Sequence, residues 1–162
     1  MLRFFCAAPL TRYPPTMEHP LELSHQAGPV VITLAYVALY YAFQIRVALT
    51  KARLAGEYTA RGEKFDRYFG QDRQMLAADR VQLNMLEHMP PFLVLLWLHA
   101  VFVGPTSATI AGAIYLLARG AYPILLGGRL GRGVKASIFI STLPSYLVLI
   151  YLGGALVSAL LG

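Results

Sequence analysis

Apolar residues run along the chain in four long stretches, at about residues 28–49, 82–103, 106–127 and 136–161. A helix needs about 20 mainly apolar residues to cross the hydrocarbon core of a bilayer, and each stretch reaches that length. Gly104, Pro105 and Thr106 separate the second stretch from the third and mark a chain reversal. The pattern therefore predicts an all-α integral membrane protein, a left-handed, up-down four-helix transmembrane bundle that forms one domain over residues 28–161.

The composition agrees with a membrane protein and excludes a soluble domain of this size. Of the 162 residues, 57% are hydrophobic and 14% are charged. The formal net charge of +6 would suggest nucleic acid as the partner of a soluble protein, but here the basic residues fall between the apolar stretches. We therefore expect membrane lipid and no nucleic acid. Cys6 is the only cysteine, and the four histidines have no carboxylate-rich cluster near them, so no metal site is predicted.

Basic residues are concentrated in two of the connections. The connection 50–74 holds six lysines and arginines, the connection 128–135 holds three, and the reversal at 104–106 holds none. Because cytoplasmic loops retain Lys and Arg, both basic connections are predicted to face the cytoplasm, with both termini on the opposite side. We interpret residues 56–74 as an interfacial loop that contains at most a helical turn.

Residues 1–27 are predicted to form a non-cytoplasmic tail. The segment LRFFCAAPL is too short for the apolar core of a signal peptide. Met17 is an alternative start, which would leave a short lead into the first helix. The short chain and the plain tail favour a bacterial inner membrane over an endoplasmic reticulum membrane.

Polar side chains interrupt the apolar pattern of the second helix. At 100° per residue, Arg80, Asn84 and Glu87 fall within about 60° of one another. His88 lies at the margin of the same face, whereas Gln82 points to the opposite side. One face of this helix is therefore predicted to need polar partners inside the membrane.

The third helix carries a matching polar face, formed by Tyr115, Arg119 and Tyr122 at spacings of four and three residues. With a rise of 1.5 Å per residue, Arg119 lies about 12 Å and Glu87 about 10 Å from the same rim of the membrane. The two charges are therefore predicted at matching depth, where they would neutralise each other.

Mutual neutralisation explains one pair but not the number of polar groups. A charged side chain at the centre of a bilayer costs about 2.5 to 3.5 kcal/mol, and small residues pack helices at lower cost. The two faces offer guanidinium groups for carboxylates, a carboxylate for an ammonium group, and amide and phenol groups for peptide hydrogen bonds. We therefore predict a site for a small, zwitterionic, anionic peptide.

Two sequence segments carry a family resemblance: RVQLNMLEHMP at 80–90 and YLLARGAY at 115–122. Together they resemble the signature of the membrane-associated proteins in eicosanoid and glutathione metabolism, the MAPEG family, and the likeness extends over about residues 28–161. The resemblance implies a homotrimer that binds glutathione as co-substrate between neighbouring subunits, near the cytoplasmic rim. The implied binding residues are Arg80, Gln82, Asn84, Glu87, Arg119 and Tyr122. His88 joins this site at a position where leukotriene-forming relatives have Tyr.

The resemblance also implies a basic residue that stabilises the glutathione thiolate, since a thiol becomes a nucleophile near pH 7 when a positive charge lowers its pKa. Arg132 is our catalytic candidate, and Arg129 and Lys135 are the alternatives. A purely topological, positive-inside role is the structural alternative for all three. The implied function is a membrane-bound glutathione-dependent transferase or peroxidase that acts on lipophilic electrophiles or lipid hydroperoxides.

Two other functions compete with this prediction. A non-catalytic membrane scaffold or accessory protein would have the same fold, with or without the ligand site, and no turnover. A small transporter is disfavoured, because the chain lacks the paired broken helices of inverted-repeat carriers.

Overall fold

The computed structural model describes residues 24–131, 133 and 135–162. The elements are α1 (Ala27–Ala60), α2 (Arg73–Phe102), α3 (Pro105–Leu126), the short 3-10 helix η1 (Ala136–Ile138) and α4 (Phe139–Leu161). Within the described part of the chain, four helices are long and apolar enough to cross a membrane, which confirms the prediction of an all-α membrane protein with four spans. Most of the predicted N-terminal tail, with Cys6 and the alternative start Met17, lies outside the described residues.

α1 is longer than the apolar stretch that predicted it. The helix continues past residue 49 to Ala60, so residues 56–60 are helical and their assignment to an interfacial loop is wrong. Leu54, only 1% exposed, packs in a small cluster with Met75 and Ala78 of α2 and stabilises this extension. Hydropathy detects the part of a helix that matches the hydrocarbon core, so it carries no signal for the charged turns beyond.

α2 begins at Arg73, nine residues before the apolar stretch expected from 82. Asp72 caps this end, because its Oδ1 accepts hydrogen bonds from the backbone N–H groups of Gln74 (2.8 Å) and Met75 (3.1 Å). The Tyr58 hydroxyl donates to Asp72 Oδ2 over 3.1 Å and so joins the cap to α1. The connection between α1 and α2 is therefore 61–72 and not the predicted 50–74.

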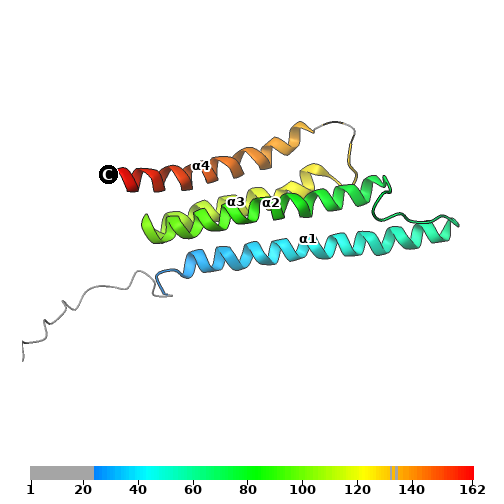
Figure 1. Ribbon diagram of the computed structural model, residues 1–162, viewed down its shortest axis with the longest axis horizontal. Helices are drawn as coiled ribbons and strands as arrows, with labels where there is room; N and C mark the ends of the chain where they lie inside the picture. Colours follow the sequence, from blue (N-terminus) through cyan, green and yellow to red (C-terminus); the bar gives the residue numbers. More distant parts are fainter. Residues whose placement is uncertain (1–23, 132, 134) are drawn as a thin grey trace, which may run out of the picture.

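The central helices of the bundle are α2 and α3, with α1 and α4 on either side (Figure 1). Each outer helix packs against both central helices, and across the described residues the two outer helices do not contact each other. Successive helices run in opposite directions, so the connections 61–72 and 127–135 share one end of the bundle, which we call the loop end. There the backbone N–H of Leu130 donates to the Arg73 carbonyl over 2.9 Å, and Arg73 Nε donates to the Leu130 carbonyl over 2.6 Å.

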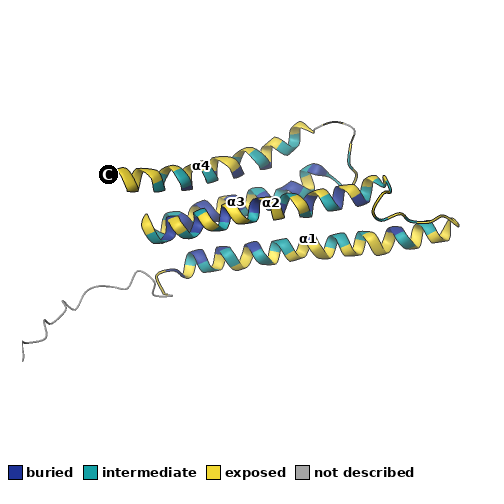
Figure 2. Cartoon of the chain, in the orientation of Figure 1, coloured by how far each residue is buried: buried dark blue, intermediate teal, exposed yellow. Residues whose placement is uncertain are grey.

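The helices bury the faces that they turn toward one another and expose the outer faces (Figure 2). In the buried interior, the rings of Tyr36, Phe92 and Tyr115 contact one another, with centroid distances of 5.2 Å from Tyr36 to Phe92, 4.0 Å from Phe92 to Tyr115 and 6.3 Å from Tyr36 to Tyr115. The outer faces carry large apolar side chains such as Leu117 (76% exposed) and Ile124 (81% exposed). In water such a surface would drive association, whereas the acyl chains of a bilayer cover it.

The close approach of the helices gives a test of the packing. A Cβ added to Gly112 of α3 would lie 2.6 Å from Ile32 Cγ2 on α1 and 3.2 Å from Leu96 Cδ1 on α2, whereas one added to Gly120 would meet nothing within 4 Å. We expect Gly112→Leu to lower the free energy of unfolding by about 1 to 3 kcal/mol through overpacking. Gly120→Leu should leave it nearly unchanged. Thermal unfolding in one detergent compares the two, and equal melting temperatures would contradict the packing.

Candidate functional site

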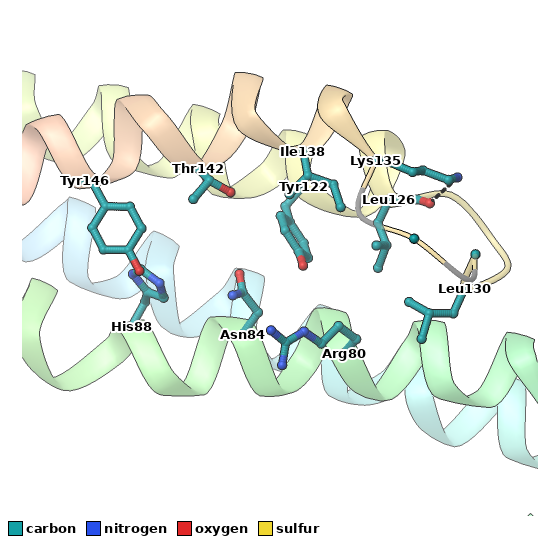
Figure 3. Close-up of a pocket in the computed structure, with 12 residues that line it drawn as sticks. Arg80, Asn84, His88, Tyr122, Leu126, Leu130, Lys135, Ile138, Thr142 and Tyr146 are labelled. Carbon is teal, nitrogen blue, oxygen red and sulfur yellow. Dashed lines mark hydrogen bonds between the residues drawn. The ribbon is translucent and has the colours of Figure 1, made fainter. Parts of the chain in front are cut away.

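A cavity of about 470 Å³ lies at the loop end, between α2, α3, α4 and the connection after α3 (Figure 3). Its volume falls in the range of roughly 300–1,000 Å³ that is usual for small-molecule sites. The lining residues are Arg80, Asn84, His88, Tyr122, Leu126, Leu130, Gly131, Gly133, Lys135, Ile138, Thr142 and Tyr146. The cavity therefore combines polar side chains from three helices with apolar side chains nearer the loop end.

Four-residue spacing explains why α2 contributes a continuous row to this cavity. Arg80, Asn84 and His88 stand one turn apart on one face of the helix, and all three point into the cavity (Figure 3). Glu87 and Gln82, which the resemblance places in a glutathione site, do not line it, and Glu87 is exposed. The cavity face of α2 is thus centred on Asn84, and Glu87 lies beside this face, outside the cavity.

Arg119 of α3 lies behind this row and is 1% exposed. Its Nη1 donates to Asn84 Oδ1 over 2.9 Å, and its guanidinium carbon lies 5.6 Å from the centroid of the Tyr115 ring. Nε and Nη2 are buried without a hydrogen-bond partner among the described residues. The expected neutralisation by Glu87 is wrong within one protomer, because the three ion pairs of the described chain all involve other residues.

His88, like Asn84, contacts a residue of α3 behind the cavity wall. Its Nδ1 lies 3.1 Å from the Tyr115 hydroxyl, and its ring makes an edge contact with Tyr146 of α4 at a centroid distance of 5.3 Å. Tyr115 therefore contacts His88 through its hydroxyl and Arg119 through its ring. Phe92 stacks on the Tyr115 ring. His88 is fixed by α3 and α4, with its ring at the wall of the cavity.

Two residues of α4 complete the polar wall and were missed from the sequence. Thr142 and Tyr146 are one turn apart and line the cavity opposite α2 (Figure 3). Ser141 and Ser145 of the same helix have the same four-residue spacing, so the sequence pattern did not single out Thr142 and Tyr146. Tyr122 of α3 was predicted and does line the cavity.

The three basic residues proposed after the third helix have different positions. Lys135 lines the cavity, and its Nζ donates to the Leu126 carbonyl at the end of α3 over 2.7 Å. Arg129 is exposed and does not line it. Arg132 lies outside the described residues.

The lining residues give the cavity a positive character. Arg80 and Lys135 carry charge, and no carboxylate is among the described residues that line it. Hydroxyl, phenol, amide and imidazole groups supply further hydrogen-bond capacity. A cavity of this kind favours a small molecule that brings carboxylates and polar peptide-like groups.

The fold and the cavity define a class, a four-span membrane bundle with a cationic small-molecule cavity at one end. The MAPEG family model matches residues 29–158, and the chain belongs to this family. The resemblance found in the segments 80–90 and 115–122 is therefore confirmed at the level of the family.

Two relatives align with more than half of the length of this chain. An uncharacterized protein of Synechocystis sp. is 35% identical over 96 residues, which cover 58% of this chain and 63% of that protein. Leukotriene C4 synthase of Bos taurus is 30% identical over 93 residues, which cover 56% of this chain and 55% of the synthase. The chain thus spans between about half and two thirds of the length of these relatives.

The bond between Asn84 and Arg119 can be tested by a double-mutant cycle. We expect Asn84→Leu to lower the free energy of unfolding by about 1.5 to 3 kcal/mol, because the buried guanidinium loses its acceptor. Adding Arg119→Met should restore part of this loss, because the buried charge is then absent. Chemical unfolding in detergent micelles measures all four proteins. Strictly additive losses would show that the two side chains are not coupled.

Proposed function

We propose that the protein binds glutathione in the loop-end cavity and uses its thiolate as a nucleophile, as a membrane-bound transferase or peroxidase. The observation that carries this proposal is the charge of the cavity: Arg80 and Lys135 line it, Arg119 stands behind Asn84, and no described lining residue is acidic. Glutathione brings two carboxylates to these cations. Membership in the MAPEG family supports glutathione as the ligand.

Each polar lining group has a role in this proposal. Arg80 binds a glutathione carboxylate, for which a guanidinium is well suited by its planar pair of donors. Asn84 and Tyr122 form hydrogen bonds with the peptide groups, and Asn84 stays oriented because Arg119 holds its oxygen. His88 contributes a ring nitrogen where leukotriene-forming relatives have Tyr.

The thiolate partner is a basic residue of the connection after α3. Arg132 is the candidate from the sequence, and Lys135 becomes its competitor because it lines the cavity. An adjacent positive charge favours the ionised sulfur and lowers the pKa of the bound thiol. The charge that helps to bind glutathione thus also activates it.

The same thiolate serves two reactions. The lipophilic substrate reaches the site laterally from the bilayer. In conjugation, the thiolate sulfur bonds to an electrophilic carbon of that substrate as the bond from this carbon to its leaving group, or to an epoxide oxygen, breaks, and the released anion takes a proton. In peroxide reduction, sulfur bonds to one peroxide oxygen as the O–O bond breaks, and the released alkoxide takes a proton to leave as an alcohol. The resulting sulfenic acid then reacts with the thiol of a second glutathione to give the disulfide and water.

The proposal includes a homotrimer in a bacterial inner membrane with both termini outside the cytoplasm. In the single protomer Glu87 is exposed and Gln82 is partly buried, and neither lines the cavity. In the proposed homotrimer, a site at a subunit interface is lined from two faces of α2, so Glu87 and Gln82 complete it from neighbouring subunits. The homotrimer therefore accounts for both residues.

Glutathione binding is measured by isothermal titration into the detergent-purified protein. Arg80→Ala should weaken binding at least about tenfold, the equivalent of one charge-assisted hydrogen bond. Lys64→Ala removes an exposed cation outside the cavity and should bind as the wild type does. Glu87→Ala should also weaken binding if a neighbouring subunit completes the site. Absence of binding to a folded wild-type trimer would favour the scaffold alternative.

The thiolate partner is identified from the pH dependence of the ultraviolet absorbance of bound glutathione. The variant that lacks the partner, Arg132→Ala or Lys135→Ala, should still bind glutathione, but the pKa of the bound thiol should rise toward the ordinary thiol value of about 8.5. Arg129→Ala should leave that pKa unchanged, and restoring the charge as Lys or Arg should lower it again. A thiol pKa that is the same in all three alanine variants would rule out this connection as the source of the stabilising charge.

A further inference from the structure

Two neighbouring aromatic side chains on the connection 61–72 are almost fully exposed. Tyr68 is 84% and Phe69 is 89% exposed, and both lie outside the four spanning helices. The other strongly exposed large apolar residues of the described chain, such as Ile124 and Leu160, lie on spanning helices whose outer faces meet lipid. The proposed glutathione site uses neither aromatic residue.

A local turn holds the two aromatic residues in place. Asp66 Oδ1 accepts hydrogen bonds from the backbone N–H groups of Tyr68 (3.0 Å) and Phe69 (2.9 Å). These bonds, that of Phe69 first, keep the pKa of the Asp66 carboxyl below its usual value, so the carboxylate form that accepts them persists at neutral pH. The two side chains are therefore presented by an ordered turn.

A second interaction sets the height of this turn along the bundle. Arg67 donates from Nη1 and Nη2 to the two carboxylate oxygens of Asp79, at 3.0 and 2.9 Å. Asp79 lies six residues after the start of α2 at Arg73, which is about 9 Å further toward the membrane. The apolar stretch of α2 begins near 82, only about 5 Å beyond Asp79. The ion pair between Arg67 and Asp79 therefore holds the turn of Tyr68 and Phe69 close to the rim of the hydrocarbon core.

The charge around the turn suits an anionic surface. Among the described residues, the exposed cations of the loop end outside the cavity are Lys51, Arg53, Arg61, Lys64, Arg73 and Arg129, against the exposed carboxylates Glu57, Glu63 and Asp66. At the opposite end, the described residues 24–30, 98–110 and 152–162 hold no Lys, Arg, Asp or Glu. Two of these cationic loop ends brought face to face would repel each other, whereas anionic phospholipid headgroups would be attracted.

We propose that Tyr68 and Phe69 insert into the phospholipid headgroup layer of the leaflet at the loop end. The proposal rests on the exposure of the two rings, on the ordered turn that presents them, on the position of this turn near the hydrocarbon core and on the cations around it. The turn is then a lipid-binding element in addition to the four spans. Aromatic rings are stable at this depth, because their faces contact the upper acyl chains while neighbouring polar groups remain hydrated. Asp79, which holds the turn through Arg67, directly precedes the cavity residue Arg80.

Lipid quenching of a single tryptophan tests this insertion. Trp97 is the only tryptophan, so Phe69→Trp in a Trp97→Phe background reports on the turn alone. The protein is reconstituted in vesicles of phosphatidylcholine and phosphatidylglycerol, with and without brominated acyl chains. We expect brominated lipid to quench most of the fluorescence and aqueous iodide to quench little. Strong iodide quenching without lipid quenching would place residue 69 in water. Protection from both quenchers would place residue 69 against another protein surface. Either result would overturn the proposal.

Two variants control the measurement. Ile124→Trp in the same background, at an 81% exposed position on a spanning helix, should be quenched strongly by brominated lipid and shows that the assay detects lipid contact. Arg67→Ala frees the turn from Asp79 and should reduce the lipid quenching of Phe69→Trp while the elution profile of the protein stays unchanged. Equal quenching with and without Arg67 would overturn the role of the ion pair.

A second probe covers the case in which Trp97→Phe, which removes the hydrogen bond from Trp97 to Thr33, prevents folding. Phe69→Cys in a Cys6→Ser background carries a single spin label and keeps Trp97. Collision with oxygen, which concentrates in lipid, should exceed collision with a water-soluble nickel chelate. The reverse ratio would contradict insertion.

Discussion

The buried charge of Arg119 is the constraint on which the rest of the structure depends. Hydrocarbon offers a guanidinium no hydrogen-bond partner, so the bundle itself has to supply one. Asn84 accepts from Nη1 at 2.9 Å, and the ring of Tyr115 lies beside the guanidinium carbon. Because Arg119 belongs to α3 and Asn84 to α2, this hydrogen bond fixes how the two central helices face each other, and α1 and α4 then pack on that pair.

The same pairing determines the wall of the cavity. Asn84 lines the cavity while its oxygen is held by Arg119, and His88 lines it while Tyr115 holds Nδ1. Two of the three cavity residues of α2 are thus supported from behind by α3, which preorganises them for a ligand. The hydrogen bonds between Leu130 and Arg73 attach the connection after α3 to the start of α2, and so bring apolar residues and Lys135 over the loop end of the site.

Positive charge without lining carboxylates gives the cavity its proposed chemistry. In the proposed function, the cations that attract the carboxylates of glutathione also favour ionisation of its thiol, so the proposed binding and activation share one electrostatic origin. Positive charge also has a role at the membrane surface in our proposal. There the cations of the loop end attract anionic headgroups, and Tyr68 and Phe69 insert among them. Membership in the MAPEG family, whose model matches residues 29–158, supports this assignment.

The sequence by itself determined the four spans and the polar faces of the second and third helices, because membrane crossing and helical periodicity are local requirements. It also placed Arg80, Asn84, His88 and Tyr122 in one site. Only the tertiary structure decided that Arg119 bonds to Asn84 and not to Glu87, since the rotation of a helix about its axis depends on packing with its neighbours. Packing also extends α1 to Ala60 and places Thr142 and Tyr146 across the cavity from α2. Both features depend on contacts between segments that are distant in the sequence, which no local pattern encodes.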